Sequence, residues 1–106
     1  MSGRRAESFR RIQTEVAGEK AAALGRAGER LEAVMLEVAR WATRIRETPD
    51  DGERADLAAS YEEARGRALE ARITLLIQRE ALGLRRHAVV DQQFPEPPSF
   101  RRLIPD

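Results

Sequence analysis

Apolar residues recur every three or four positions along most of the first half of the chain, with one gap at Lys20. They are Phe9, Ile12, Val16, Ala23, Ala27, Leu31, Val34, Val38, Trp41 and Ile45. The last lies 36 positions after the first, which is ten turns of 3.6 residues, so the series stays on one face of a helix. The pattern predicts a helix over residues 8–46. A break near residues 18–28 is the alternative, because three glycines fall there and each costs about 1 kcal/mol relative to alanine.

A turn separates this helix from a second one. Residues 48–52, Thr-Pro-Asp-Asp-Gly, favour a turn, and Asp50 or Asp51 can cap the helix that follows. Apolar residues in near-heptad spacing come next: Leu57, Tyr61, Ala64, Ala68, Ala71, Leu75 and Leu82. This spacing predicts a helix over residues 51–82, ended by Gly83, that packs antiparallel against the first. The residues expected to contact positions 31–45 of the first helix are Tyr61, Ala68 and Leu75.

The C-terminal part of the chain departs from this pattern. Residues 84–94 have the apolar spacing of a short third helix. Residues 95–106 contain four of the five prolines and are expected to be extended. We therefore predict a single all-α domain over residues 1–106, consisting of a long antiparallel helical hairpin, a short C-terminal helix and a proline-containing tail.

One stretch of the second helix, ITLLI at residues 73–77, is apolar nearly all the way round. A face roughly a quarter to half a turn from the hairpin seam carries Leu69, Ile73, Leu76 and Ile77. Burying one such side chain stabilises by about 1.5–3 kcal/mol, and leaving several in water favours aggregation. Either the C-terminal tail or a second copy of the chain can cover this face. We favour a second copy, aided by the tail, which would pair two hairpins into a dimeric four-helix bundle.

The composition argues against several kinds of chemistry. The chain has no cysteine, so it has no disulfide and no thiolate nucleophile or ligand. His87 is the only histidine; in a helix over residues 84–94 it would share a face with Asp91 and could pair with it. No phosphate-binding loop, nucleophile elbow or dinucleotide fingerprint is present. We therefore expect no enzymatic activity, no metal site and no cofactor, with His87 as a surface or helix-capping residue.

Charge and hydropathy bear on location and partners. No apolar run approaches the roughly 20 residues of a membrane span, and the N-terminus lacks the apolar region of a secretory signal, so we expect a cytoplasmic protein. The net charge is only +1. Four arginine pairs favour nucleic acid as an alternative partner: Arg4-Arg5, Arg10-Arg11, Arg85-Arg86 and Arg101-Arg102. They would form a basic patch if the chain ends cluster in a dimer, but no aromatic or recognition-helix pattern accompanies them.

Two segments carry a resemblance. They are GEKAAALGRAGERLEAV at residues 18–34 and QREALGLRRHAVV at residues 78–90, the second followed by Phe94 and prolines. Together they resemble a family of small bacterial helical proteins classed as a domain of unknown function. The resemblance covers most of the chain and implies a bacterial, cytosolic origin, but it brings no activity or site residues. From the apolar face of the second helix and the absence of catalytic motifs, and not from this resemblance, we expect a non-enzymatic homodimer that presents surfaces to a partner protein.

Overall fold

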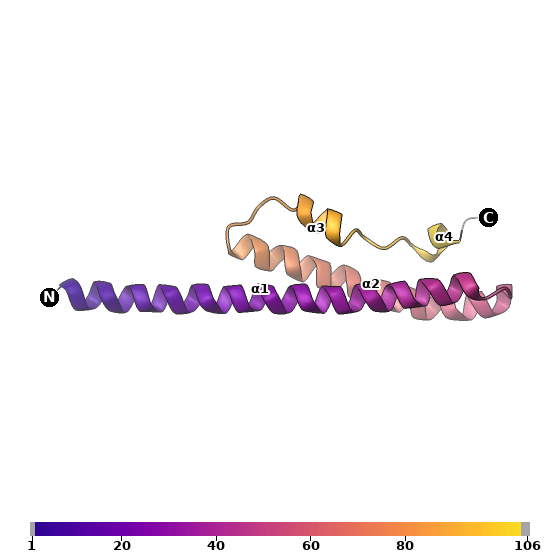
Figure 1. Ribbon diagram of the computed structural model, residues 1–106, viewed down its shortest axis with the longest axis horizontal. Coiled ribbons are helices and arrows are strands. Elements are labelled where there is room, and N and C mark those ends of the chain that lie inside the picture. Colours follow the sequence, from indigo (N-terminus) through magenta and orange to yellow (C-terminus); the bar gives the residue numbers. More distant parts are fainter. Residues whose placement is uncertain (1, 105–106) are drawn as a thin grey trace.

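The computed structural model describes residues 2–104, which form four helices and no strand. The helices are α1 (Ser2–Glu47), α2 (Asp51–Ala81), α3 (Ala88–Gln93) and α4 (Phe100–Leu103). α1 and α2 form a long antiparallel hairpin, and the chain after α2 runs back along it (Figure 1). The predicted all-α fold with a helical hairpin and a short C-terminal helix is therefore confirmed. The rod measures 76 × 20 × 15 Å.

α1 is one unbroken helix. It begins at Ser2 rather than near Ser8, and the alternative break near residues 18–28 does not occur. Alanine, arginine and glutamate surround the three glycines of this region, and these strong helix formers offset the cost of the glycines. A Cβ atom added at Gly18, Gly25 or Gly28 would meet nothing within 4 Å, so no other backbone approaches the helix there.

The ends of α2 are set by local chemistry that the sequence predicted. Asp50 is the N-cap, and its Oδ2 accepts a hydrogen bond from the Glu53 N–H at 2.9 Å. Gly83 adopts a φ of 82°, the left-handed conformation that ends many helices. The Leu84 N–H then donates to the Arg79 carbonyl at 2.9 Å, which closes the last turn. The expected role of Gly83 as the helix-ending glycine is thus confirmed.

Two clusters of buried side chains fill the space between the helices. The cluster at the turn end contains Val38, Ala42, Ile45, Tyr61, Ala64, Ala68 and Leu103. The second cluster lies further from the turn and contains Ala27, Leu31, Ala71, Leu75 and Val90. The predicted contacts of Tyr61, Ala68 and Leu75 with the second half of α1 are therefore confirmed. Alanine supplies much of the α2 side of this seam, and its small side chain lets the two helices lie close together.

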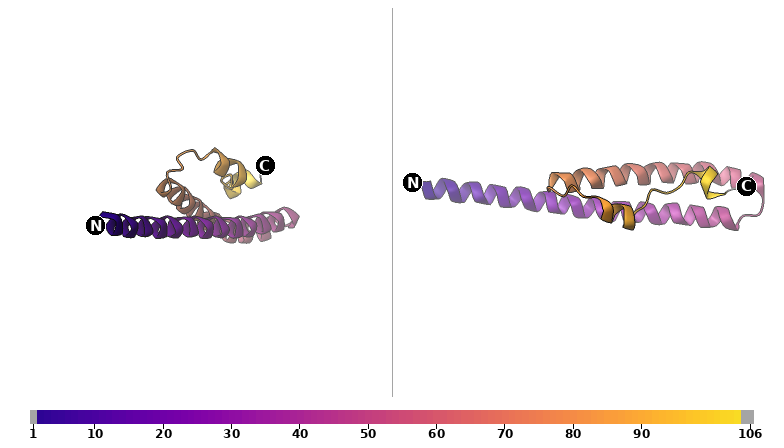
Figure 2. Two further views of the ribbon diagram at one scale, coloured as in Figure 1. Left: turned by 60° about the vertical axis from the view of Figure 1, so that its left-hand side comes forward. Right: turned by 90° about the horizontal axis from the view of Figure 1, so that it is seen from above.

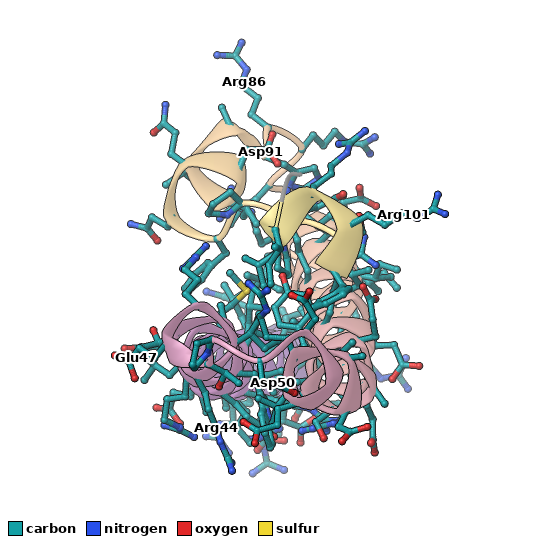
Figure 3. The ribbon with its side chains drawn as sticks, turned by 90° about the vertical axis from the view of Figure 1, so that its right-hand side faces the viewer. Arg44, Glu47, Asp50, Arg86, Asp91 and Arg101 are labelled. Atoms are coloured by element: carbon teal, nitrogen blue, oxygen red, sulfur yellow. The ribbon has the colours of Figure 1, made fainter. Side chains whose placement is uncertain are left out.

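The segment after α2, residues 84–104, which includes α3 and is called the C-terminal tail from here on, lies along the line where α1 and α2 meet (Figure 2). Val90 of α3 enters the second cluster, with Phe94 against its edge, and Leu103 of α4 enters the cluster at the turn end. Viewed from that end, α3 and α4 sit above the pair formed by α1 and α2 (Figure 3). The helix expected over residues 84–94 is shorter because its first four residues reverse the chain direction. The segment after it, expected to be extended, contains the single turn α4.

α1 extends well past the end of α2. Lys20 Nζ donates to the Ala81 carbonyl at 3.4 Å, which places the end of α2 level with Lys20. Residues 2–19, which we call the arm, therefore have no other helix of the described residues 2–104 beside them (Figures 1 and 2). Every residue from Gly3 to Ala22 is exposed.

Candidate interaction surfaces

Side chains of α2 hold the C-terminal tail by its backbone. The Tyr61 hydroxyl donates to the Pro98 carbonyl. Arg65 Nε donates to the Pro97 carbonyl at 2.9 Å. Because proline has no N–H, these tail residues offer only carbonyl acceptors, and α2 supplies the matching donors. The tail is therefore fixed by specific hydrogen bonds as well as by apolar packing.

Arg72 fixes the part of the tail around α3. Its Nε donates to the Phe94 carbonyl at 3.0 Å, and its guanidinium also pairs with the carboxylates of Asp91 and Glu96. The Arg72 side chain is only 12% exposed, so little water competes for these contacts. Neither this arginine nor the donor roles of Tyr61 and Arg65 were predicted from the sequence. Their spacing of four and seven residues, which puts all three on one helix face, was the available signal.

The four residues predicted to form an interface between two copies fall into different environments. Leu76 is half-buried against the cluster that contains Val90 of the tail, and Leu69 is half-buried as well. Ile73 and Ile77 are each 57% exposed. The tail therefore covers part of the apolar face of α2, and Ile73 and Ile77 form its uncovered edge.

The arm exposes three residues of the apolar series that lies on one face of the first helix. Phe9, Ile12 and Val16 are 62%, 56% and 42% exposed, and we call these three residues the arm stripe. Their spacing continues that of Ala27 and Leu31, which are buried under α2 further along the same helix. The arm stripe is thus the hairpin seam continued beyond the point where α2 ends.

The arginine pairs are spread along the rod. All eight residues are exposed: Arg4, Arg5, Arg10, Arg11, Arg85, Arg86, Arg101 and Arg102. Arg4 lies near the tip of the arm, whereas Arg101 lies in α4 toward the opposite end of the rod (Figure 1). Arg86 and Arg101 point away from the helices into solvent (Figure 3). A single chain therefore does not gather the arginine pairs into one patch.

His87 stands at the N-cap position of α3, but its side chain makes no capping hydrogen bond. Its Nε2 lies 3.1 Å from Glu80 Oε1, and its Nδ1 lies 3.4 Å from Arg79 Nε. The pair that His87 could form with Asp91 in a helix over residues 84–94 is not present: His87 contacts Glu80, and Asp91 pairs with Arg72. Among residues 2–104, no group of three or more histidine, cysteine, aspartate or glutamate side chains is arranged to hold a metal ion.

One ion pair links the two long helices. Arg67 donates from both terminal nitrogens to the two carboxylate oxygens of Glu37, at 2.7 and 2.9 Å. These hydrogen bonds lower the pKa of Glu37 below its ordinary value of 4.5 and raise the pKa of Arg67. Glu37 also lies three residues from Arg40, and Arg67 lies four residues from Glu63, spacings that permit ion pairs within each helix. The pair between the two helices is bidentate, which makes it stronger than a single contact.

Two of the open hollows on the described surface are lined in part by charged residues. One is bordered by Glu37, Arg40, Trp41 and Arg44, with the Arg44 guanidinium 5.5 Å from the centre of the Trp41 ring. The other lies between the tail and α2, beside Arg65.

Over residues 2–104, none of the helices is both long enough and apolar enough to cross a membrane. Comparison of the chain with protein-family models, curated proteins and solved structures gives no match.

Proposed function

We propose that this chain is a non-enzymatic, cytoplasmic homodimer whose helical surfaces bind a partner protein. The observation that carries the proposal is the arm stripe. Phe9, Ile12 and Val16 lie exposed on the arm, the part of α1 that no other segment of residues 2–104 covers. Further along α1, the same face is buried by α2, so the stripe is a seam without its second helix.

The energetics favour a partner for the arm. An amphipathic helix in a protein gains most of its stability from packing its apolar face, and α2 does not extend far enough to pack against the arm. Fully burying each of the three side chains is worth about 1.5–3 kcal/mol, and two copies would bury six of them. Ile73 and Ile77, exposed on α2, offer a second and smaller surface, which fits a partner protein or a further contact between copies.

Sedimentation tests the proposal. We expect the intact chain to sediment as a dimer and Val16→Glu to sediment as a monomer, because the new carboxylate would be buried without a partner. Thr14→Glu is the matched control, since Thr14 is exposed on the opposite side of the arm and should leave the dimer intact. An intact chain that sediments as a monomer overturns the homodimer.

Nucleic acid is the alternative partner, and the exposure of all eight paired arginines is the observation in its favour. Phosphate contacts release counterions, so the affinity for duplex DNA should fall with salt at a log–log slope near −0.9 per phosphate contacted. The measurement is a salt titration of binding to a labelled duplex. No binding at low salt eliminates this alternative and leaves the protein partner.

A further inference from the structure

We infer that the arms of two copies pair antiparallel, each lying on the seam that the other copy's α2 leaves empty. This inference rests on the proposed homodimer and adds its geometry. The unfilled part of the seam on α1 is the arm itself, residues 2–19, because α2 ends level with Lys20. At 1.5 Å per residue, these 18 residues are about 27 Å long.

The direction follows from where α2 lies. In a parallel pair, the two copies of α1 would stay side by side beyond Lys20, where each already carries α2 on the face that forms the pair. The helices would have to diverge or the hairpins would collide. In an antiparallel pair, the two hairpins point away from each other and only the arms overlap. The second copy's arm then continues the line and the direction of α2, which also runs antiparallel to α1 (Figure 2).

The length of the gap sets the register. When Ser2 of one copy lies beside Glu19 of the other, the arms overlap fully without meeting α2, and every facing pair of residue numbers sums to 21. Phe9 then faces Ile12 of the second copy, and Arg5 faces Val16. Positions 5, 9, 12 and 16 alternate by four, three and four residues, which is the spacing of an antiparallel coiled-coil core. The same register therefore aligns the apolar layers and fills the gap.

Charge agrees with this arrangement. Arg5 comes within one turn of Glu19 of the second copy, and its long apolar stem can cover Val16 while its guanidinium reaches the carboxylate. The arm tip, with Arg4 and Arg5, also comes to the C-terminal end of α2 in the second copy. That end carries the negative pole of the helix dipole and the exposed carboxylate of Glu80. A parallel pair would instead place the four arginines at the arm tips together.

The C-terminal tail is not available to cover the arm stripe. It follows α2 toward the turn, and Arg72, Arg65 and Tyr61 hold it there. Its last helix, α4, lies in the cluster at the turn end with Leu103. Residues 84–104 therefore do not cover the arm stripe, and the arm of a second copy has the matching length, apolar spacing and charge.

Cysteine crosslinking tests the register, because the natural chain has no cysteine to interfere. Two single variants are prepared, Arg5→Cys and Val16→Cys, and are oxidised alone and as a mixture. A disulfide needs Cα atoms within about 7 Å, and in the antiparallel register only residue 5 of one variant meets residue 16 of the other. Identical positions lie 11 residues apart, or about 16 Å along the axis. We expect crosslinked dimer in the mixture and none with either variant alone.

The outcomes separate this inference from the proposed homodimer. Crosslinking of Val16→Cys with itself indicates a parallel pair and overturns the inference, although the homodimer stands. A dimer by sedimentation in which Ile77→Cys crosslinks with itself and the arm variants do not also overturns it, and assigns the interface to Ile73 and Ile77. A chain that sediments as a monomer overturns both proposals. Thr14→Cys is the control, since it lies on the outer side of the arm and should not crosslink.

Discussion

Removing the Tyr61 hydroxyl should loosen the C-terminal tail without disturbing the hairpin. Tyr61 is 1% exposed, and its ring belongs to the cluster at the turn end. The hydroxyl donates to the Pro98 carbonyl, so Tyr61→Phe keeps the packing and removes only the hydrogen bond. The loss of one such bond costs about 0.5–1.5 kcal/mol of the free energy of unfolding. Pro98 is exposed and its carbonyl can bind water instead, so we expect a loss near the middle of that range, about 1 kcal/mol.

The assay is thermal unfolding followed by circular dichroism at a fixed protein concentration. A loss of about 1 kcal/mol corresponds to a decrease in Tm of roughly 4–8 °C for a chain of this size. Thr74→Val is the control, because the Thr74 hydroxyl donates only to the Glu70 carbonyl within α2. This change also removes a hydroxyl but leaves the tail contacts in place.

Alkaline pH provides an independent check on the contribution of the buried Tyr61 hydroxyl. Burial raises the pKa of the Tyr61 phenol above its ordinary value of 10.0, since the folded chain favours the neutral form. The stability that Tyr61 contributes is therefore complete below pH 10.0 and is lost as the pH rises through the raised pKa. The natural chain should lose this stability while Tyr61→Phe does not, so the difference between them shrinks. Tyr61 is the only tyrosine, so tyrosinate absorbance follows its titration directly.

Two results would refute this reasoning. The first is a Tyr61→Phe variant as stable as the natural chain at neutral pH, which would mean that the hydroxyl does not secure the tail. The second is a stability difference that does not change as the pH rises through the tyrosine titration.

The remaining predictions concern the seam, the ion pair and the tail. Leu31→Ala should cost about 2–5 kcal/mol in urea unfolding because Leu31 is fully buried, whereas Leu36→Ala, at a 57% exposed position, should change stability by less than about 0.5 kcal/mol. Glu37→Gln should destabilise the fold at neutral pH by removing the Arg67 pair. Because the pKa of Glu37 is lowered, this contribution to stability is complete above pH 4.5 and is lost as the pH falls through the lowered pKa. The urea midpoints of the variant and the natural chain should therefore converge in acid. Deleting residues 95–106 should lower Tm by uncovering the cluster at the turn end, and an unchanged Tm would mean that α4 contributes no cover.

The hairpin was predictable because its determinants are local. The apolar period places Leu31 and Tyr61 on the seam faces of their helices, and both are fully buried. Asp50 and Gly83 set the ends of α2 through contacts with residues within a few positions of them. Such contacts depend on short stretches of sequence, so composition and spacing were enough to find them.

The course of the tail was not predictable, because its contacts join residues far apart in sequence. Phe100 N–H donates to Glu62 Oε1 at 2.6 Å, across 38 positions, and nothing in either residue type identifies the other as its partner. Arg65 and Arg72 are charged residues of the kind expected on a solvent-exposed helix face, yet both donate hydrogen bonds to carbonyls of the tail. The contact of Leu76 with the cluster that contains Val90 is also long-range, so Leu76 was predicted, like Ile73, to lie in an interface between copies. A change at Leu76 therefore tests the packing of the chain as much as its association.

Because α1 is one unbroken helix, the direction in which the arm stripe points depends on the number of residues between the arm and the seam under α2. Each residue inserted or removed between Val16 and Ala27 would turn the arm stripe by about 100° relative to the seam under α2. Losing two residues would point the stripe to nearly the opposite side of the rod, whereas losing seven would return it to within about 20° of its present direction. The length of this segment therefore determines the direction in which the exposed face points. A chain of this kind can change its reach in steps of about two turns, while a change of a single residue redirects the surface it presents.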